Sequence, residues 1–373
     1  MVLLNRKVKT TASKAMTQED RQPLLKAPES ALPLPPWLPI IGPRLRRHLR
    51  LAATAVLLLG FLATTFLYKS STLSGVLETI TSQSTTGERI PMNKEIREQI
   101  AQRTHVVTTT YYPDTTDIRF QLALDLCNLA FHYKIHTFIV DDSPNFQDIS
   151  DQFTRAGGGY VHVFQQNKNA AGGSYVGKGG ALRQAIARVT KRIKHTAGLS
   201  FEETTIIFTE PEKVDLMNHL FDISKPILDG ETDVVVPMRN DDLFRETYPI
   251  EQYHSESFGN LHFDLMAKQF PGFQREGAQK LDWLFGPFAF RANLASGWLN
   301  YHGTAWDAQM VPYVRGVRND NWRIMSVIIN FHHKEVMKRQ EEGTAAWTKK
   351  RLMQLNLLFE LLGDEELVER TES

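Results

Sequence analysis

Residues 136–143 read HTFIVDDS and residues 177–186 read GKGGALRQAI. The first stretch is a short apolar run that ends in two aspartates, a pattern typical of a buried strand with polar residues at its carboxyl end. The second begins with glycines and continues at helical spacing, which predicts a helix directly after a glycine-rich loop. Strands that alternate with helices in this way predict βαβ units and a mostly parallel sheet.

The same alternation continues along most of the chain. An α/β, Rossmann-like, mostly parallel sheet is therefore the predicted fold class. Helices are expected at residues 116–133, from about residue 180, and at 345–362. Strands are expected at residues 105–112, 136–140, 160–164, 204–208, 233–237 and 324–331.

The composition excludes several classes of protein. With 42 acidic and 43 basic side chains among 373 residues, the chain has no charge excess that would favour nucleic acid as a partner. Cys127 is the only cysteine, so an intrachain disulfide or a cysteine-based zinc site is impossible. We interpret Cys127 as a buried thiol.

The first 68 residues have a different character. Residues 1–43 are polar and rich in proline, and we expect a disordered cytosolic tail. Residues 44–50 contain four arginines, and residues 51–68, LAATAVLLLGFLATTFLY, carry no charge. Eighteen helical residues span about 27 Å, enough for a thin bilayer. Residues 44–68 are therefore predicted to be a basic flank and one transmembrane helix, and the alternatives are a buried core helix or a cleaved signal sequence.

The arginines before this segment predict a cytosolic N-terminus, and hence a type II membrane protein with a signal-anchor in the Golgi or ER membrane. Residues 69–100, rich in Ser and Thr, are expected to form a stem. The catalytic domain is then predicted at residues 101–335, with a C-terminal helical extension at 336–373.

Polar residues follow three consecutive predicted strands. Ligands bind at the carboxyl ends of parallel strands, where loops and helix N-termini meet. The second strand is followed by Asp141 and Asp142, the third by the Lys178 loop, and the fourth by Glu210 and Glu212. Taken alone, the glycine-rich loop is better interpreted as a loop with solvated cations, but its combination with VDDS favours a phosphate-binding site.

VDDS at residues 140–143 together with KGGALR at 178–183 resembles the family 2 glycosyltransferases and their relatives with the GT-A fold. The resemblance covers about residues 106–333. It implies a nucleotide-diphospho-sugar donor and transfer to a hydroxyl acceptor, which is a glycan, a lipid or a small molecule. By this resemblance Thr109, Tyr111 and Asp141 line the nucleoside, while Lys178 and Arg183 lie near the diphosphate.

The same family places an Asp-x-Asp after the fourth strand, where it binds Mn²⁺ or Mg²⁺. This chain has Glu210-Pro211-Glu212 there, and two carboxylates at this spacing still offer oxygen ligands to a hard divalent ion. Some relatives take a further ligand from a late histidine, for which His332 and His333 are the candidates. Because side chains alternate along an extended segment, only one of these histidines should face the site. The alternatives are loop carboxylates paired with Lys213 or other cations, and a structural histidine.

Two segments are candidates for the acceptor side, LDWLFGPFAFR at residues 281–291 and TAWDAQM at 304–310. Asp307 is the candidate general base and Asp282 the reserve. Arg239 is a candidate phosphate or acceptor contact, or simply a surface residue. The aromatic side chains of these segments either stack on sugar faces or belong to the core; they are Trp283, Phe285, Phe288 and Trp306.

The sequence thus predicts a membrane-anchored, metal-assisted glycosyltransferase of the hexosyltransferase class. A catalytically inactive, membrane-tethered sugar-binding or scaffold protein is the alternative of another class, with the glutamate pair as a degenerate metal motif. A nucleotidyltransferase is a further alternative, although such enzymes usually carry the glycine loop directly after the first strand.

Overall fold

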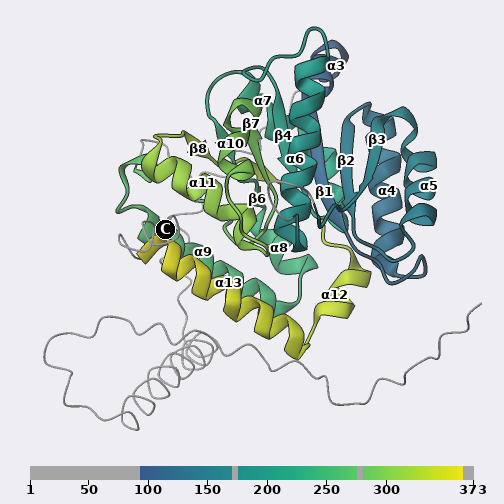
Figure 1. The fold of residues 1–373 in the computed structure, drawn as a ribbon. Helices are drawn as coiled ribbons and strands as arrows, with labels where there is room; N and C mark the ends of the chain where they lie inside the picture. The colour runs from purple at the N-terminus through teal and green to yellow at the C-terminus, as the bar shows by residue number, and fades with distance from the viewer. Residues whose placement is uncertain (1–92, 170–174, 275–279, 364–373) are drawn as a thin grey trace, which may run out of the picture. The chain divides into compact units, whose positions relative to one another are not determined.

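The computed structural model describes residues 93–169, 175–274 and 280–363 (Figure 1). The predicted tail at 1–43, the anchor at 44–68 and the part of the predicted stem before residue 93 lie outside these residues. Within the described ranges, no helix combines the length and the apolar character needed to cross a bilayer.

Strands and helices alternate through the first half of the described chain and helices dominate the second. The strands are β1 Thr104–Thr110, β2 His136–Asp141, β3 Val161–Gln165, β4 Thr205–Phe208, β5 Val234–Val235, β6 Met238–Arg239, β7 Phe288–Arg291, β8 Ile324–Met325 and β9 Ile328–Ile329. The α-helices are α3 Lys94–Gln102, α4 Ile118–Tyr133, α5 Phe146–Gly157, α6 Gly177–His195, α7 Leu220–Leu228, α8 Asp241–Thr247, α9 Ile250–Ala267, α10 Ala295–Leu299, α11 Asp307–Asn319, α12 Glu335–Glu341 and α13 Ala345–Gly363.

Seven strands form the main sheet in the order β3-β2-β1-β4-β7-β5-β8. The pairs β1–β2, β1–β4, β2–β3 and β5–β8 are parallel, and β7 runs antiparallel between β4 and β5. β6 and β9 form a small second sheet. The prediction of a mostly parallel α/β sheet is confirmed.

Both faces of the main sheet are covered by helices, as Figure 1 shows. Side chains alternate along each strand, so that Val107 and Phe208 pack on one face while Val106 and Ile207 pack on the other. The first face is covered by α6, α9, α10, α11 and α13, and the second by α3, α4, α5 and α7. Buried strands of this kind need apolar residues on both faces, which explains the continuous runs VVTT, TFIV and TIIF.

The described body extends beyond residues 101–335 at both ends. Ile100 and Ala101 of α3 are buried, and Leu358 and Leu362 of α13 are fully buried in the core of the first face. The predicted helix at 345–362 is therefore confirmed, and it is part of the same core as the sheet.

The prediction of one continuous strand at residues 324–331 is wrong, because these residues form two short strands in different sheets. β8 pairs with β5 in the main sheet, whereas β9 pairs with β6. β7 was not predicted, since its residues were assigned to an acceptor segment.

Candidate functional site

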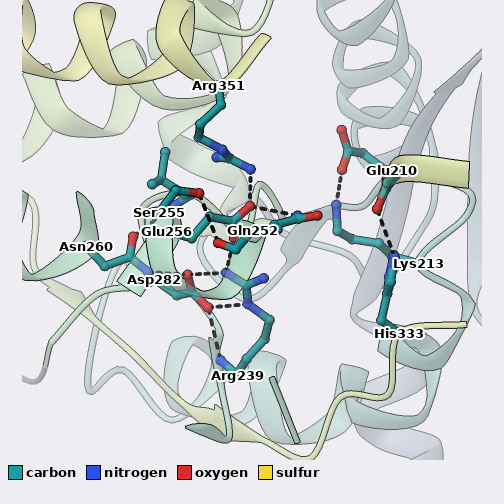
Figure 2. A network of polar contacts seen from close by, with 12 residues as sticks. Glu210, Lys213, Arg239, Gln252, Ser255, Glu256, Asn260, Asp282, His333 and Arg351 are labelled. Carbon is teal, nitrogen blue, oxygen red and sulfur yellow. Dashed lines mark hydrogen bonds and ion pairs between the residues drawn. The ribbon is translucent and has the colours of Figure 1, made fainter. Parts of the chain in front are cut away.

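Glu210 follows β4 at the carboxyl end of the sheet, and two lysines hold its carboxylate. Lys178 Nζ, from the first turn of α6, donates to Glu210 Oε1 at 2.6 Å. Lys213 Nζ donates to Glu210 Oε2, as Figure 2 shows. The predicted convergence of the third and fourth strand ends is therefore present, with two ammonium groups on one carboxylate.

The charges around Glu210 determine its ionisation. Burial opposes ionisation, but Lys178, Lys213 and Lys350 together hold the pKa of the carboxyl group well below its ordinary value. Burial also acts against the charge of Lys213, yet the neighbouring Glu210 raises the pKa of that ammonium group. The pKa shifts of Glu210 and Lys213 thus favour the charged form of both groups.

A polar cavity opens beside this cluster. Glu210, Glu212 and Lys213 line it together with His333 and Glu341. His333 Nε2 lies 3.0 Å from Glu341 Oε2, and only 7 % of the His333 side chain is exposed. The side chain of His332 is 61 % exposed and lies near Asp215 instead. Of the two histidines, His333 is thus the one that faces the site.

The predicted metal ligands share this cavity but do not gather into a ligand set. Both oxygens of Glu210 are occupied by ammonium groups. Across residues 93–169, 175–274 and 280–363, no three His, Cys, Asp or Glu side chains come together as a metal-binding group would require. The side chains present do not form a prepared metal site, and we derive no chemical step through a metal ion.

The glycines of GKGG, at residues 177–180, allow another segment of the backbone to pack closely against them. A Cβ on Gly179 would lie 2.3 Å from the carbonyl oxygen of Gly303 and 2.7 Å from Cβ of Ala308. Gly177 has φ +67°, and a Cβ there would lie 2.4 Å from the carbonyl oxygen of Thr304. The space beside Gly177 and Gly179 is thus occupied by the segment that precedes α11.

Arg183 stabilises the same segment. Its Nη1 donates to the carbonyl oxygens of Tyr301 at 2.8 Å and Gly303 at 2.6 Å, and the residue is only 4 % exposed. Arg183 therefore connects α6 to the loop before α11, whereas Lys178 remains the cation of this motif that reaches the site.

Asp141 is fully buried at the end of β2. It accepts hydrogen bonds from Thr110 Oγ1 at 2.6 Å, from Ser143 Oγ at 2.7 Å and from Ser143 N at 3.0 Å. Burial raises the pKa of its carboxyl group, although these hydrogen bonds act in the opposite direction. Of the other residues predicted to line the nucleoside, Thr109 is partly buried and Tyr111 is 54 % exposed.

Asp307 is the first residue of α11, and its carboxylate fixes the preceding loop. Oδ2 accepts a hydrogen bond from Tyr301 OH at 2.8 Å, and Oδ1 accepts one from Ala305 N at 3.0 Å. Asp307 does not belong to the lining of the Glu210 cavity, whereas the neighbouring Trp306 does.

Asp282 does not fit the role of reserve base. Arg239 Nε and Nη2 each donate to one of its oxygens at 2.7 Å, and Asn260 Nδ2 donates to Oδ1 at 2.7 Å. Arg239 also donates to Glu256 Oε2 at 2.6 Å (Figure 2). The charges of Arg239 and Asp282 are thus paired with each other inside the protein. The alternative that Arg239 is a surface residue is wrong, because it is buried between two carboxylates; Arg239 also lines the Glu210 cavity, and its role as a phosphate or acceptor contact stays a prediction.

Three of the four candidate aromatic residues belong to the core. Each of these three is at most 2 % exposed: Trp283, Phe285 and Phe288. Trp306 is partly buried and lines the cavity beside Glu210. The core alternative therefore holds for the first three, and Trp306 remains available to a ligand.

Sequence reasoning missed the cavity wall formed by α9 and α13. Gln252 and Glu256 come from α9, and Arg351 and Gln354 come from α13. The sequence signal available was a glutamine or a charged residue on the otherwise apolar side of each helix. Such a residue identifies a buried polar contact only after its partner helix is known.

No protein-family model and no curated protein matches the chain. Among solved structures, glucosyl-3-phosphoglycerate synthase from Mycobacterium tuberculosis in complex with Mn²⁺ and UDP-glucose is 15 % identical, with 73 % of this chain and 83 % of that chain covered and a TM-score of 0.47. Mannosyl-3-phosphoglycerate synthase from Rubrobacter xylanophilus is 12 % identical, with 74 % and 79 % covered and a TM-score of 0.44.

A cytidylyltransferase from Leptospira borgpetersenii is also similar, at 12 % identity and a TM-score of 0.34, with 62 % of this chain and 79 % of that chain covered. Identities and TM-scores this low do not assign a function. The case for function rests on the chain's own motifs and geometry.

Proposed function

We propose that this chain is a glycosyltransferase that moves a sugar from a nucleotide-diphosphate donor to a hydroxyl acceptor. The observation that carries the proposal is the meeting of Lys178, Lys213 and Glu210 at the carboxyl end of a parallel sheet, beside a polar cavity. Ligands of such sheets bind at this edge, and oriented ammonium groups there suit a diphosphate.

The chemistry that this arrangement supports is stabilisation of the leaving group. As the bond between the anomeric carbon and the diphosphate breaks, negative charge develops on the departing oxygen. One shared carboxylate positions Lys178 and Lys213. Their ammonium groups are therefore fixed before the nucleotide sugar binds. Fixed charges in a partly dehydrated site lower the barrier more than mobile ions in water do.

A divalent cation, Mn²⁺ or Mg²⁺, is retained in the proposal as the cofactor class implied by the sequence resemblance. When bound, such an ion would neutralise part of the diphosphate charge. Glu210, Glu212 and His333 border the cavity in which it would lie. The roles of Asp141, Thr109 and Tyr111 at the nucleoside and of Asp307 as general base also remain proposals.

The membrane anchor and the Golgi or ER location belong to the proposal as well. They are supported by the uncharged run at residues 51–68 and by the arginines that precede it.

The decisive experiment uses the full-length protein with UDP- and GDP-sugars, with and without Mn²⁺. Thermal stabilisation identifies the donor, and release of nucleoside diphosphate measures its hydrolysis. Lys178→Met should lower this hydrolysis by about tenfold or more, the effect expected when one charge-assisted contact to the diphosphate is lost. Lys194→Met is the matched control, because Lys194 is an exposed lysine at the other end of the same helix.

The alternatives give different results in the same assay. A nucleotidyltransferase would release pyrophosphate from a nucleoside triphosphate in the presence of a sugar phosphate. An inactive sugar-binding or scaffold protein would show no hydrolysis. Absence of both stabilisation and hydrolysis with every nucleotide sugar, with or without Mn²⁺, would sink the transferase proposal.

A further inference from the structure

Buried polar atoms without a partner concentrate in the wall formed by α9 and α13. Gln252, Arg351 and Gln354 are 7 %, 6 % and 6 % exposed, and all three line the cavity that contains Glu210. Within the described residues, Gln252 Oε1, Gln354 Oε1 and both Nε and Nη1 of Arg351 make no hydrogen bond. Buried polar groups in proteins are nearly always paired, so four such atoms in one cavity indicate a missing ligand.

Gln252 and Arg351 are held in place by their other atoms. Gln252 Nε2 donates to Glu256 Oε1 at 2.8 Å, and Arg351 Nη2 donates to the same oxygen. Glu256 in turn accepts a hydrogen bond from Arg239 Nη2 at 2.6 Å. Figure 2 shows this chain of contacts from Arg351 through Glu256 to Arg239. The unpaired atoms of Gln252 and Arg351 therefore belong to oriented side chains with a fixed direction.

The unpaired atoms define the chemistry of their ligand. The two amide oxygens require hydrogen-bond donors, and the two guanidinium N–H groups require acceptors. A hydroxyl group supplies both. Glu256 already compensates the charge of Arg351, so the ligand needs no acidic group at this position.

Two tryptophans complete the cavity. Trp306 and Trp347 are partly buried and belong to its lining, and the guanidinium of Arg351 lies 5.1 Å from the ring centroid of Trp347. An indole face is an apolar surface that suits the C–H face of a sugar ring, while the amides bind its hydroxyl groups. Aromatic faces beside amide groups favour a saccharide over a lipid chain.

We propose that the cavity between α9 and α13 is the acceptor subsite and that the acceptor is an uncharged saccharide. The assignment rests on the proposed function and specifies its acceptor. In the transfer, an acceptor hydroxyl oxygen bonds to the anomeric carbon of the donor, and the bond from that carbon to the diphosphate oxygen breaks with its electron pair. The hydroxyl proton passes to a base, the role proposed for Asp307. The C-terminal helix α13 is then part of the active site.

The test measures binding first, because binding does not depend on turnover. Saturation-transfer NMR with methyl α-D-glucoside and methyl α-D-mannoside, on the full-length protein without nucleotide sugar, should detect binding. Gln354→Met should weaken this binding about tenfold, the effect of losing one buried hydrogen bond. Methionine has a similar shape and removes the unpaired oxygen, so the melting temperature should not fall. Thermal stabilisation by the donor nucleotide sugar should remain as in the wild type.

Thr205→Val provides the matched control. Thr205 in β4 is fully buried, and its Oγ1 also has no partner among the described residues, but it does not line the cavity. This variant removes a buried unpaired atom in the same way and should leave saccharide binding unchanged.

Each outcome separates the two proposals. Unchanged saccharide binding by Gln354→Met, or no binding by the wild type, overturns the acceptor subsite even if the protein hydrolyses nucleotide sugars. Transfer to phospholipid vesicles but not to the glycosides also overturns it. Saccharide binding that is lost in Gln354→Met, without any nucleotide-sugar hydrolysis, supports the subsite and contradicts the transferase.

Discussion

Gly179 has no room for a side chain because two distant parts of the chain meet at its Cα. Its N–H donates to the carbonyl oxygen of Thr304 at 3.0 Å, and the carbonyl of Gly303 lies where a Cβ would be. Backbone atoms are the obstacle, so a rotamer change cannot relieve the contact. This close packing fixes the first turn of α6, and with it the position of Lys178 beside Glu210.

Gly179→Ala should therefore destabilise the protein by about 1–3 kcal/mol, the usual cost of overpacking a well-packed position. Urea unfolding followed by fluorescence measures the change. Gly159→Ala is the matched control, since a Cβ at Gly159 meets no atom within 4 Å. We expect that control to stay within about 0.5 kcal/mol of the wild type. Equal stability of the two variants would contradict the packing argument.

At the level of the elements, one buried network of charges connects β6, α9, α13 and the loop that contains Asp282. Arg239 contacts Asp282 and Glu256, and Glu256 contacts Arg351. The side chains of Arg239 and Glu256 are each 1 % exposed. Opposing carboxylates raise the pKa of Arg239 even though burial acts against its charge. Three aromatic rings also surround the Arg239 guanidinium, those of Phe244, Tyr248 and Phe285.

Replacement of Arg239 by Met should lower the free energy of unfolding by about 3–5 kcal/mol, because it leaves two buried carboxylates without their common partner. Chemical denaturation measures this loss. Arg323→Met is the comparison: Arg323 pairs with Asp233, but its side chain is 41 % exposed, and such exposed pairs contribute about 0–1 kcal/mol. Similar losses in both variants would show that burial of the Arg239 pair does not matter.

Local pattern predicted β1, β2, β3, β4 and α4 to within two residues, whereas α3 and α5 were not predicted. β1, β2 and β4 are almost entirely buried and carry apolar residues on both faces, as a buried parallel strand needs. β7 was missed because Phe288 and Phe290 are equally compatible with core and with sugar stacking. Only the pairing of β7 with β4 and β5 distinguishes the two.

The sequence predicted the positions of some candidate-site residues but not the contacts of others, because those contacts depend on tertiary structure. Lys178, Glu210 and Glu212 follow strands or open a helix, so sequence order places them at one edge of the sheet. The roles of Arg183, Asp282 and Arg239 depend on residues far away in sequence, namely Tyr301, Asn260 and Glu256. Such partners are set by tertiary packing, which no local pattern reports.

At the scale of the whole molecule, the two edges of the main sheet carry opposite chemistry. The carboxyl edge holds the charged cluster of Lys178, Lys213 and Glu210. Near the opposite edge, three histidines lie on neighbouring strands, where His105 of β1 pairs with His136 of β2 and Phe138 pairs with His162 of β3. Arg192 Nη2 from α6 lies 2.6 Å from His136 Nε2, and His136 Nδ1 lies 3.0 Å from His162 Nε2.

This arrangement requires neutral imidazoles. Arg192 has only donors, so His136 Nε2 accepts and its Nδ1–H donates to His162. His105 is fully buried, and within the described residues neither of its ring nitrogens has a partner. Burial first, then the neighbouring His136 and Arg192, lower the pKa of His105 to about 3. Burial and Arg192 lower the pKa of His136 to about 4, and they lower the pKa of His162 as well.

Acid should therefore destabilise the fold as pH falls below 6.5. The unfolded chain binds protons on His105 and His136 near pH 6.5, whereas the folded chain resists them down to about pH 3–4. Their contribution to stability is complete above pH 6.5 and is lost as pH falls towards 4. Each histidine contributes a slope of up to about 1.4 kcal/mol per pH unit in that window. Denaturant unfolding at pH 7, 6 and 5 measures the slope, which should be smaller in His105→Leu. An equal slope in the two proteins would show that His105 does not resist protonation in the folded state.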